Sequence, residues 1–175
     1  MQKFLILFVL FISSSCIKVS DGDVKSGGVA VTSKSYFNCT NNATESTAFL
    51  YTFKSDGKYV LEIMFYDANN CTVASKRERN YIYGEYNFNP TTGDFTDRPF
   101  KLEIIPLTAA DVLSKNGVSD CGFTGWAVDV AKDATDNNSC AGGTIYTTTP
   151  AFTFQATFND SIYDDGNTIF TRVNP

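Results

Sequence analysis

The residues of this chain best suited to chemistry are five cysteines, and no histidine accompanies them. Without an imidazole, Ser-His-Asp and Cys-His catalysis and histidine metal sites are excluded. The cysteines also lack the Cys-x-x-Cys spacing of thioredoxin-like redox sites and zinc knuckles. Disulfide formation is therefore the chemistry that we expect of them, and the chain is expected to have no enzymatic activity, no cofactor and no metal site.

Four of the cysteines lie beyond an N-terminal export signal, at Cys39, Cys71, Cys121 and Cys140. An even number of cysteines in an oxidising compartment favours two disulfides, and four cysteines allow three pairings. Each cysteine borders a strand-like run, so a bond between cysteines that are neighbours in sequence can close a local β-unit. This favours the pairs Cys39–Cys71 and Cys121–Cys140. Each bridge could stabilise the fold by about 3–4 kcal/mol, because it restrains the unfolded chain.

The export signal is expected to occupy residues 1–20, with cleavage somewhere between residues 15 and 22. Lys3 supplies the positive charge, and residues 4–12 form an apolar run that is too short to span a membrane. No other stretch approaches the roughly 18 apolar residues of a membrane helix. We therefore expect a secreted, extracellular protein with no transmembrane segment.

Cys16 leaves a second location open, because a lysine, an apolar run, small residues and then a cysteine also make a bacterial lipoprotein signal. That signal usually has a leucine three residues before the cysteine, and Ser13 stands there in this chain. In this alternative a lipid on Cys16 anchors the protein at the cell surface, and four cysteines again remain for disulfides.

Five Asn-x-Ser/Thr triplets predict a glycoprotein, with acceptors at Asn38, Asn42, Asn70, Asn137 and Asn159. Asn38 and Asn70 each precede a cysteine, so modification there could compete with disulfide formation.

The charges of the chain point to no particular partner. The net charge of −5 argues against nucleic acid and anionic membranes. The acidic residues gather in short polar stretches that lack the ligand spacing of a calcium loop, so they are typical of solvated turns: Asp133, Asp136, Asp160, Asp164 and Asp165. A protein partner is not indicated.

Alternating apolar and polar residues predict β-strands along most of the chain. The clearest are residues 47–54 and 58–66, which flank an Asp56-Gly57 turn and so predict a hairpin. Further strands are expected at residues 71–79, 80–89, 100–105, 122–132, 144–148, 150–158 and 167–173. One short helix is expected at residues 108–115, with Thr108 as its N-cap.

About eight strands at this spacing predict an all-β fold, an antiparallel up-and-down barrel with one short helix. A β-sandwich is the alternative. Residues 21–33 are expected to form a flexible lead-in that could hold a first strand, and residues 34–175 a single disulfide-closed domain. Fifteen Phe, nine Tyr and one Trp could either fill the core or line an apolar cavity, because the same alternation builds both.

The order of these elements resembles a known family. Cys39 precedes the hairpin, which ends in Tyr-Asp-x-x-x-Cys at Cys71; the strand YIYGEY follows, and then a strand leads through Pro106 into the helix. Cys121-Gly, Trp126 and Cys140 complete the pattern. Over about residues 34–145 the chain is similar to a lipocalin-like domain of the secreted adenomatosis polyposis coli down-regulated family.

The resemblance implies an open β-barrel, two disulfides and binding of lipid or another apolar ligand. There are departures: residues 34–38 lack the tryptophan that the family carries before its first cysteine, and the animal members have two domains and a membrane anchor. Their antagonism of Wnt signalling is therefore not transferred to this chain.

The sequence thus predicts a secreted lipocalin-like protein that binds an apolar small molecule or lipid. The alternative is an extracellular or cell-surface interaction module with a filled core and no ligand. The sequence singles out no ligand-binding residues.

Overall fold

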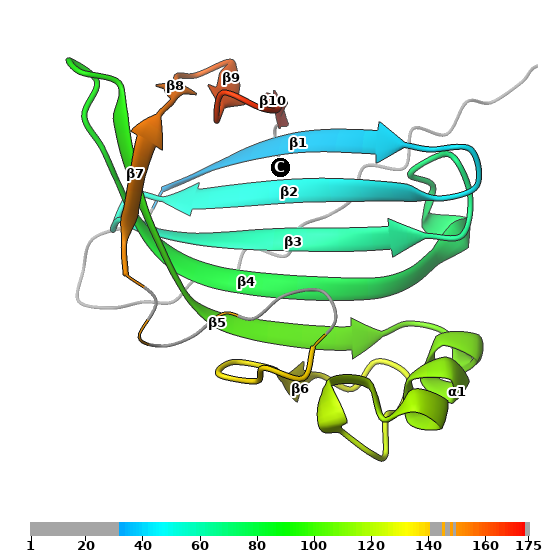
Figure 1. Cartoon of the computed structure of the whole chain (residues 1–175). Helices are drawn as coiled ribbons and strands as arrows, with labels where there is room; N and C mark the ends of the chain where they lie inside the picture. The colour runs from blue at the N-terminus through cyan, green and yellow to red at the C-terminus, as the bar shows by residue number, and fades with distance from the viewer. Residues whose placement is uncertain (1–31, 141–144, 146–147, 149, 174–175) are drawn as a thin grey trace, which may run out of the picture.

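Ten strands form one antiparallel sheet in the computed structural model, which describes residues 32–140, 145, 148 and 150–173 (Figure 1). In chain order the strands are β1 Ser33–Asn41, β2 Ser46–Lys54, β3 Lys58–Tyr66, β4 Lys76–Phe88, β5 Asp94–Pro106, β6 Lys132–Asp133, β7 Phe152–Gln155, β8 Thr157–Phe158, β9 Ile162–Asp164 and β10 Ile169–Val173. The α-helix α1 spans Ala109–Val118, and the 3-10 turns η1 and η2 span Val73–Ser75 and Asp120–Gly122.

The sheet follows an up-and-down order, β6-β5-β4-β3-β2-β1-β10-β9-β8, with β7 pairing β5. The predicted all-β antiparallel fold is therefore confirmed. Among the residues that the structure describes, however, the hydrogen-bonded ladder does not close into a complete ring. At one end of the sheet, β7 pairs β5 while the next strand, β8, pairs β9, so one short segment links the two edges there. Between them the Ala156 N–H donates to the Gly93 carbonyl at 2.9 Å.

The predicted hairpin is formed by β2 and β3. On β2, Phe49, Tyr51 and Phe53 alternate with Leu50, Thr52 and Lys54, which face the other side of the sheet. Gly57 closes the turn in the left-handed region at φ +80°. The Asp56 carboxylate accepts the Lys58 N–H at 3.2 Å and so stabilises the turn. We call the face of the sheet that carries these three aromatic residues the inner face, and the opposite one the outer face.

The pairing of β4 with β5 contains a β-bulge. Tyr83 of β4 pairs with Lys101 and the next residue, Gly84, pairs with Pro99, so β5 has one extra residue between these two partners. The bulge changes which residues face inward. Phe95 and Leu102 are an odd number of positions apart, yet both are buried, at 1% and 7% exposure. The bulge thus keeps the two halves of β5 facing the interior.

Helix α1 begins as predicted, because the Thr108 side chain accepts the Asp111 N–H at 3.1 Å. It ends at Val118, three residues beyond the predicted end, with Ser119 in a left-handed conformation as its C-cap.

Several strand predictions need correction. The strand expected at residues 122–132 is wrong apart from Lys132, because Gly122, Gly125 and Asp129 adopt left-handed conformations that interrupt an extended chain. The strands expected at 71–79 and 80–89 are largely one strand, β4. Strands β1 and β9 were not predicted.

Parts of other predictions lie outside the described residues. These include the signal, most of the lead-in and most of the strand at 144–148, of which residues 145 and 148 are not in a strand.

Three clusters of buried residues stabilise the sheet. The aromatic cluster on the inner face consists of Tyr36, Phe53, Tyr59, Leu61, Phe95, Tyr163 and Phe170. The tryptophan cluster consists of Leu102, Ile104, Cys121, Trp126 and Ala134, and Ile82 packs against both clusters. The outer-face cluster consists of Ala48, Met64 and Tyr66.

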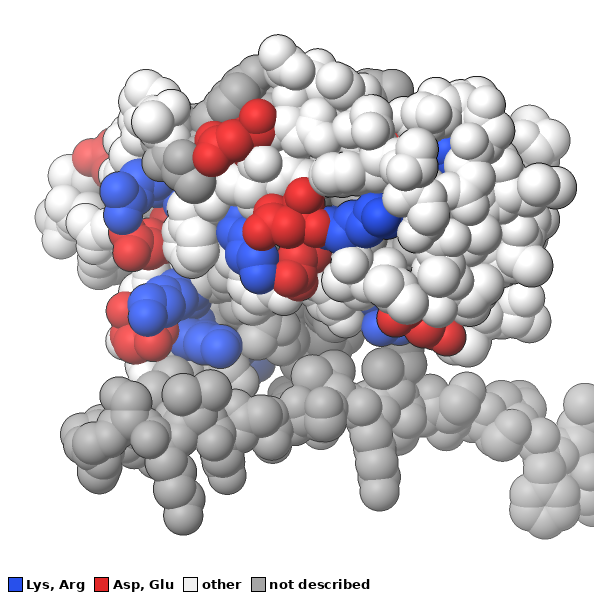
Figure 2. Space-filling view, turned by 90° about the horizontal axis from the view of Figure 1, so that it is seen from below, with Lys and Arg blue, Asp and Glu red and all other residues white. Residues whose placement is uncertain are grey.

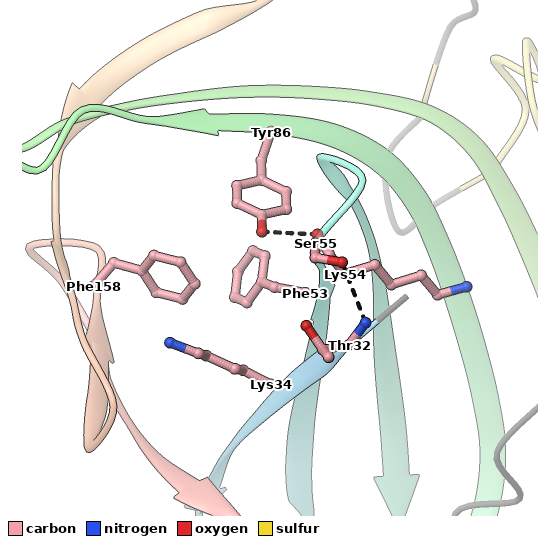
Figure 3. A pocket seen from close by; sticks show the side chains of 7 residues that line it. All are labelled: Thr32, Lys34, Phe53, Lys54, Ser55, Tyr86 and Phe158. Carbon is pink, nitrogen blue, oxygen red and sulfur yellow. Dashed lines mark hydrogen bonds between the residues drawn. The ribbon is translucent and has the colours of Figure 1, made fainter. Parts of the chain in front are cut away.

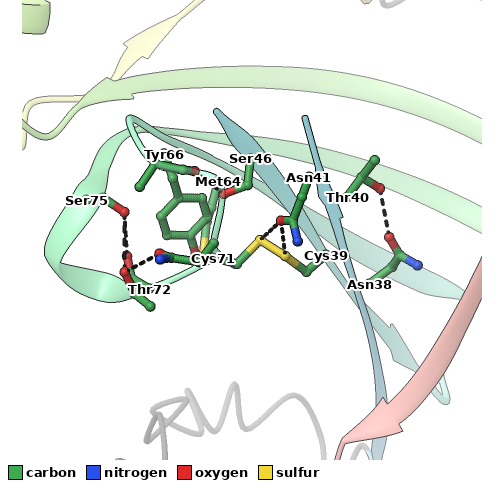
Figure 4. Close-up of a disulfide and its surroundings, with 12 residues drawn as sticks. Asn38, Cys39, Thr40, Asn41, Ser46, Met64, Tyr66, Cys71, Thr72 and Ser75 are labelled. Carbon is green, nitrogen blue, oxygen red and sulfur yellow. Dashed lines mark hydrogen bonds between the residues drawn. A yellow bond between two sulfur atoms is a disulfide. The ribbon is translucent and has the colours of Figure 1, made fainter. Parts of the chain in front are cut away.

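Both predicted disulfides are present. Cys39 of β1 bonds to Cys71 in the loop after β3, beside the outer-face cluster (Figure 4). Cys121 bonds to Cys140 within the tryptophan cluster. The two bridges therefore belong to different cores, and each ties a loop to the sheet or to a neighbouring loop.

Candidate functional site

The inner face of the sheet is the place where a lipocalin-like protein would hold a ligand, and here it is occupied by aromatic rings. Phe53 lies at the centre and is 2% exposed. Its ring centroid is 4.9–5.9 Å from the centroids of Tyr36, Tyr51, Tyr59, Tyr86, Phe95, Phe158 and Tyr163. Most of these pairs are edge-to-face or tilted, the geometry that aromatic rings prefer in a packed core.

A small pocket lies at the end of this aromatic core, with a volume of about 120 Å³ (Figure 3). The rings of Phe53, Tyr86 and Phe158 form its apolar wall. Its polar rim consists of Thr32, Lys34, Lys54 and Ser55. The pocket is well below the roughly 300–1,000 Å³ of typical ligand sites.

Three polar groups of the pocket are already engaged within the protein. The Lys34 ammonium pairs with the Asp160 carboxylate at 2.5 Å, and the Tyr86 hydroxyl donates to the Lys54 carbonyl at 2.9 Å. The Ser55 hydroxyl oxygen accepts the Thr32 N–H at 3.2 Å. Figure 3 shows the Lys54 side chain leading away from the three rings. What the pocket offers a ligand is therefore mainly its aromatic wall.

One carboxylate, Asp97 of β5, lies among the tyrosines of the inner face. The Tyr59 hydroxyl lies beside it. Among the described residues, its Oδ1 atom is buried without a hydrogen-bond partner. Burial raises the pKa of Asp97 above its ordinary value, and the interactions with the Tyr59 hydroxyl and the Arg98 backbone only partly oppose this. Burial, together with the negative charge of Asp97, also raises the pKa values of the Tyr51, Tyr59 and Tyr163 hydroxyls.

A second cluster of charges lies beside α1. The Lys115 ammonium is 2.7 Å from both the Glu78 and the Asp120 carboxylates and 5.1 Å from the Trp126 ring centroid. Burial lowers the pKa of Lys115, but its hydrogen bonds to Asp120 and Glu78 outweigh this, so the pKa is raised and the side chain stays charged. The cluster is a cross-link between β4, α1 and the following turn, and each charge in it has a partner.

The Asn116 side chain holds α1 against the next loop. It donates to the Trp126 carbonyl at 3.2 Å and accepts the Trp126 N–H at 2.9 Å. The indole Nε1 of Trp126 is buried without a partner. The arrangement positions the tryptophan.

The outer face carries paired charges. Arg79 pairs with Glu62 at 2.8 Å and Lys101 with Glu103 at 2.6 Å. Figure 2 shows acidic and basic residues side by side on the face that it draws. The surface in that view thus presents mixed charge and no large field of one sign.

The structure places the predicted site residues as follows. The four cysteines form the two disulfides. The five sequon asparagines are spread over β1, three turns and the loop before Cys140, and they do not form one site. The Asp164 and Asp165 carboxylates accept backbone N–H groups of the turn that follows them, as expected of turn residues.

Sequence reasoning missed the pocket and Asp97. The pocket residues come from separate parts of the chain, so no local pattern identifies them. Asp97 did leave a signal, because it stands at the inward position between Phe95 and Pro99, both of which are buried. A carboxylate at such a position in an alternating strand marks a buried polar group.

Comparisons with known proteins give no family for this chain: no protein-family model matches it, and no significantly similar protein is found among the curated ones. In the described part of the chain, no helix is long and apolar enough to span a membrane. The same residues contain no group of three or more His, Cys, Asp or Glu side chains that could hold a metal ion.

Proposed function

We propose that this protein is an extracellular or cell-surface interaction module whose interior is filled by its own side chains. The observation that carries the proposal is the aromatic cluster, whose rings occupy the inner face of the curved sheet. A carrier of lipid needs an apolar chamber at this place. The rings of this cluster contact one another where that chamber would be.

The disulfides support the extracellular part of the proposal. Such bonds persist in oxidising compartments and are rare in the cytosol. They also fix two loops, which suits a domain that presents a rigid surface to a partner.

A second candidate function is binding of a compact apolar molecule, and the pocket walled by Phe53, Tyr86 and Phe158 favours it. An apolar cavity of about 150 Å³ is enough for benzene. The pocket volume of about 120 Å³ therefore fits, at most, one small ring and no lipid chain.

Two binding measurements on the secreted, disulfide-bonded protein separate these functions. A titration with a dansyl-labelled fatty acid tests the carrier function, and an NMR titration with benzene tests the pocket. Saturable uptake of the fatty acid would overturn the interaction-module proposal, and saturable binding of benzene alone would favour the second candidate.

The positive test uses fluorescently labelled protein on intact cells of the source organism, with unlabelled protein as competitor. We expect the labelled protein to bind saturably. Unlabelled folded protein should displace it, and reduced, unfolded protein should not. Absence of displaceable binding would contradict the proposal, whatever the result of the ligand titrations.

A further inference from the structure

The structure separates the five sequons into two kinds. Two of them share the tripeptide Asn-Cys-Thr, and the disulfide Cys39–Cys71 brings them together (Figure 4). In both, the threonine hydroxyl donates to the asparagine Oδ1, from Thr40 to Asn38 at 3.0 Å and from Thr72 to Asn70 at 2.7 Å. The sequences and the local hydrogen bonds are therefore alike, and only the amide nitrogen distinguishes the two sites.

The amide nitrogen of Asn38 is part of the fold. Asn38 lies half-buried in β1, and its Nδ2 donates to the Ile169 carbonyl of β10 at 2.9 Å. The backbone pairing of these two strands ends at Phe37 and Thr171, so this side-chain bond extends their contact. A sugar on this nitrogen would lie between the two strands.

Asn137 is engaged in the same way. Its Nδ2 donates to the carbonyl of the buried Cys121 at 2.7 Å, and its Oδ1 accepts the Ser139 N–H at 2.9 Å. Both ends of the amide are thus fixed inside the loop that the second disulfide closes. A glycan here would have to separate the loop from Cys121.

The other three asparagines are exposed, and only their Oδ1 atoms are engaged. Asn70 lies in the loop after β3. Asn42 Oδ1 accepts the Thr44 and Glu45 N–H groups, and Asn159 Oδ1 accepts those of Ser161 and Ile162. Within the described part of the chain, the Nδ2 atoms of these three residues make no hydrogen bond.

We propose that Asn42, Asn70 and Asn159 carry N-linked glycans and that Asn38 and Asn137 remain unmodified as structural amides. The donor would be a polyprenyl-diphosphate-linked oligosaccharide, used by the oligosaccharyltransferase of the secretory pathway. A bond forms between Nδ2 and the anomeric carbon of the first sugar, and the bond from that carbon to the diphosphate oxygen breaks. Nδ2 loses one proton, and the lipid diphosphate leaves.

The modified sites would be unevenly distributed over the molecule. The Asn41 side-chain oxygen is 3.2 Å from the Cys39 sulfur, and Asn42 follows it directly, while Asn70 precedes Cys71. Two glycans would thus flank the first disulfide. The loop closed by the second disulfide would carry none, because its only sequon is Asn137.

The test is a peptide map of the full chain secreted by a eukaryotic host, after deglycosylation in ¹⁸O-labelled water, which marks each formerly glycosylated asparagine. We expect the label at residues 42, 70 and 159 in most molecules. Label at Asn38 or Asn137 in the secreted protein, or its absence at any of the other three, overturns the proposal.

The shared tripeptide provides a matched pair of variants. Thr72→Ala should remove the mass of one glycan, and Thr40→Ala should leave the glycan mass unchanged, since both variants keep their asparagine. In addition, Asn38→Gln should lower the amount of secreted protein, while Asn70→Gln should lower only its mass. A loss of glycan mass in Thr40→Ala, or equal secretion of Asn38→Gln and the parent, contradicts the assignment.

Discussion

The two ends of the sheet are stabilised in different ways. At the aromatic end, where the aromatic cluster meets β7–β10, the contacts join residues far apart in the chain, as in the bond of the Tyr36 hydroxyl to the Asn159 carbonyl at 2.5 Å. At the helix end, formed by α1, η2 and the tryptophan cluster, several of the links are short in sequence. The second disulfide spans 19 residues, and Lys115 pairs with Asp120 five residues on.

The two ends also differ in their backbone conformation. In the part of the chain that the structure describes, the four non-glycine residues with positive φ all lie at the helix end: Ser119, Cys121, Asp129 and Asp136. Each such conformation costs on the order of 1 kcal/mol and is kept only where its surroundings enforce it. The local cross-links of the helix end therefore hold a strained chain, while the aromatic end holds extended strands mainly by burial of rings from distant parts of the chain.

This difference can be measured, because each end has its own spectroscopic signal. Trp126 is the only tryptophan and lies at the helix end, while three of the four buried tyrosines, Tyr36, Tyr59 and Tyr163, belong to the aromatic cluster. Tryptophan emission and tyrosine near-ultraviolet circular dichroism thus report the two ends separately.

The largest expected effect is that of Phe53→Ala. Truncation of a fully buried Phe at the centre of a packed core costs about 3–5 kcal/mol. We expect this loss in urea unfolding followed by the tyrosine signal. The matched control is Phe152→Ala, at a residue that is 48% exposed, which should change the free energy of unfolding by about 0.5 kcal/mol or less. Similar losses in the two variants would show that the aromatic end is not a packed core.

Removal of the second disulfide, with Cys121→Ala and Cys140→Ala together, should cost about 2–5 kcal/mol. We expect the Trp126 emission to shift to the red in the absence of urea, since the strained helix end relaxes first, with the tyrosine signal retained. Removal of Cys39 and Cys71 instead should leave the tryptophan emission unchanged. Loss of both signals together would mean that the two ends fold as one unit.

Two glycine substitutions are expected to change the stability of the protein in opposite directions. Gly84 of β4 lies beneath the Tyr59 ring, which a Cβ there would overlap, so Gly84→Ala should destabilise the protein by about 1–3 kcal/mol. Gly117 of α1 has open space around its Cβ position, so Gly117→Ala should stabilise it by up to about 1 kcal/mol. Thermal unfolding of both variants checks this, and an unchanged or higher stability of Gly84→Ala would contradict the packing of Tyr59 on Gly84.

The smallest expected effect is the pH dependence that comes from Asp97. Because its pKa is raised in the folded protein, the folded state binds the proton more tightly, and stability is lost as the pH rises through that pKa. Asp97→Asn removes this loss. The gain in stability of the variant over the parent should therefore be greatest at neutral pH. This gain should become smaller at pH values below about 4, where the carboxyl is protonated in the unfolded parent as well. Urea unfolding at several pH values measures it, and a pH-independent difference would exclude a buried, charged Asp97.

The sequence by itself determined the local features of this protein. Alternation identified the hairpin of β2 and β3 and the inward aromatic residues, Thr108 marked the start of α1, and the cysteine spacing favoured the two bridges that form. Each of these depends on residues close in sequence, or on the oxidising compartment that the predicted export signal implies.

Tertiary structure decided what the inner face encloses. A period of two assigns Phe53 and Phe95 to one face, but it does not say whether that face surrounds a ligand or meets another ring. This depends on how strongly the sheet curves and on the segment of β7 and β8 that links its edges. Tertiary structure also distinguishes the Asn38 amide from the Asn70 amide. The two tripeptides are identical, but only Asn38 lies beside a distant strand, β10, whose Ile169 carbonyl accepts its side-chain N–H.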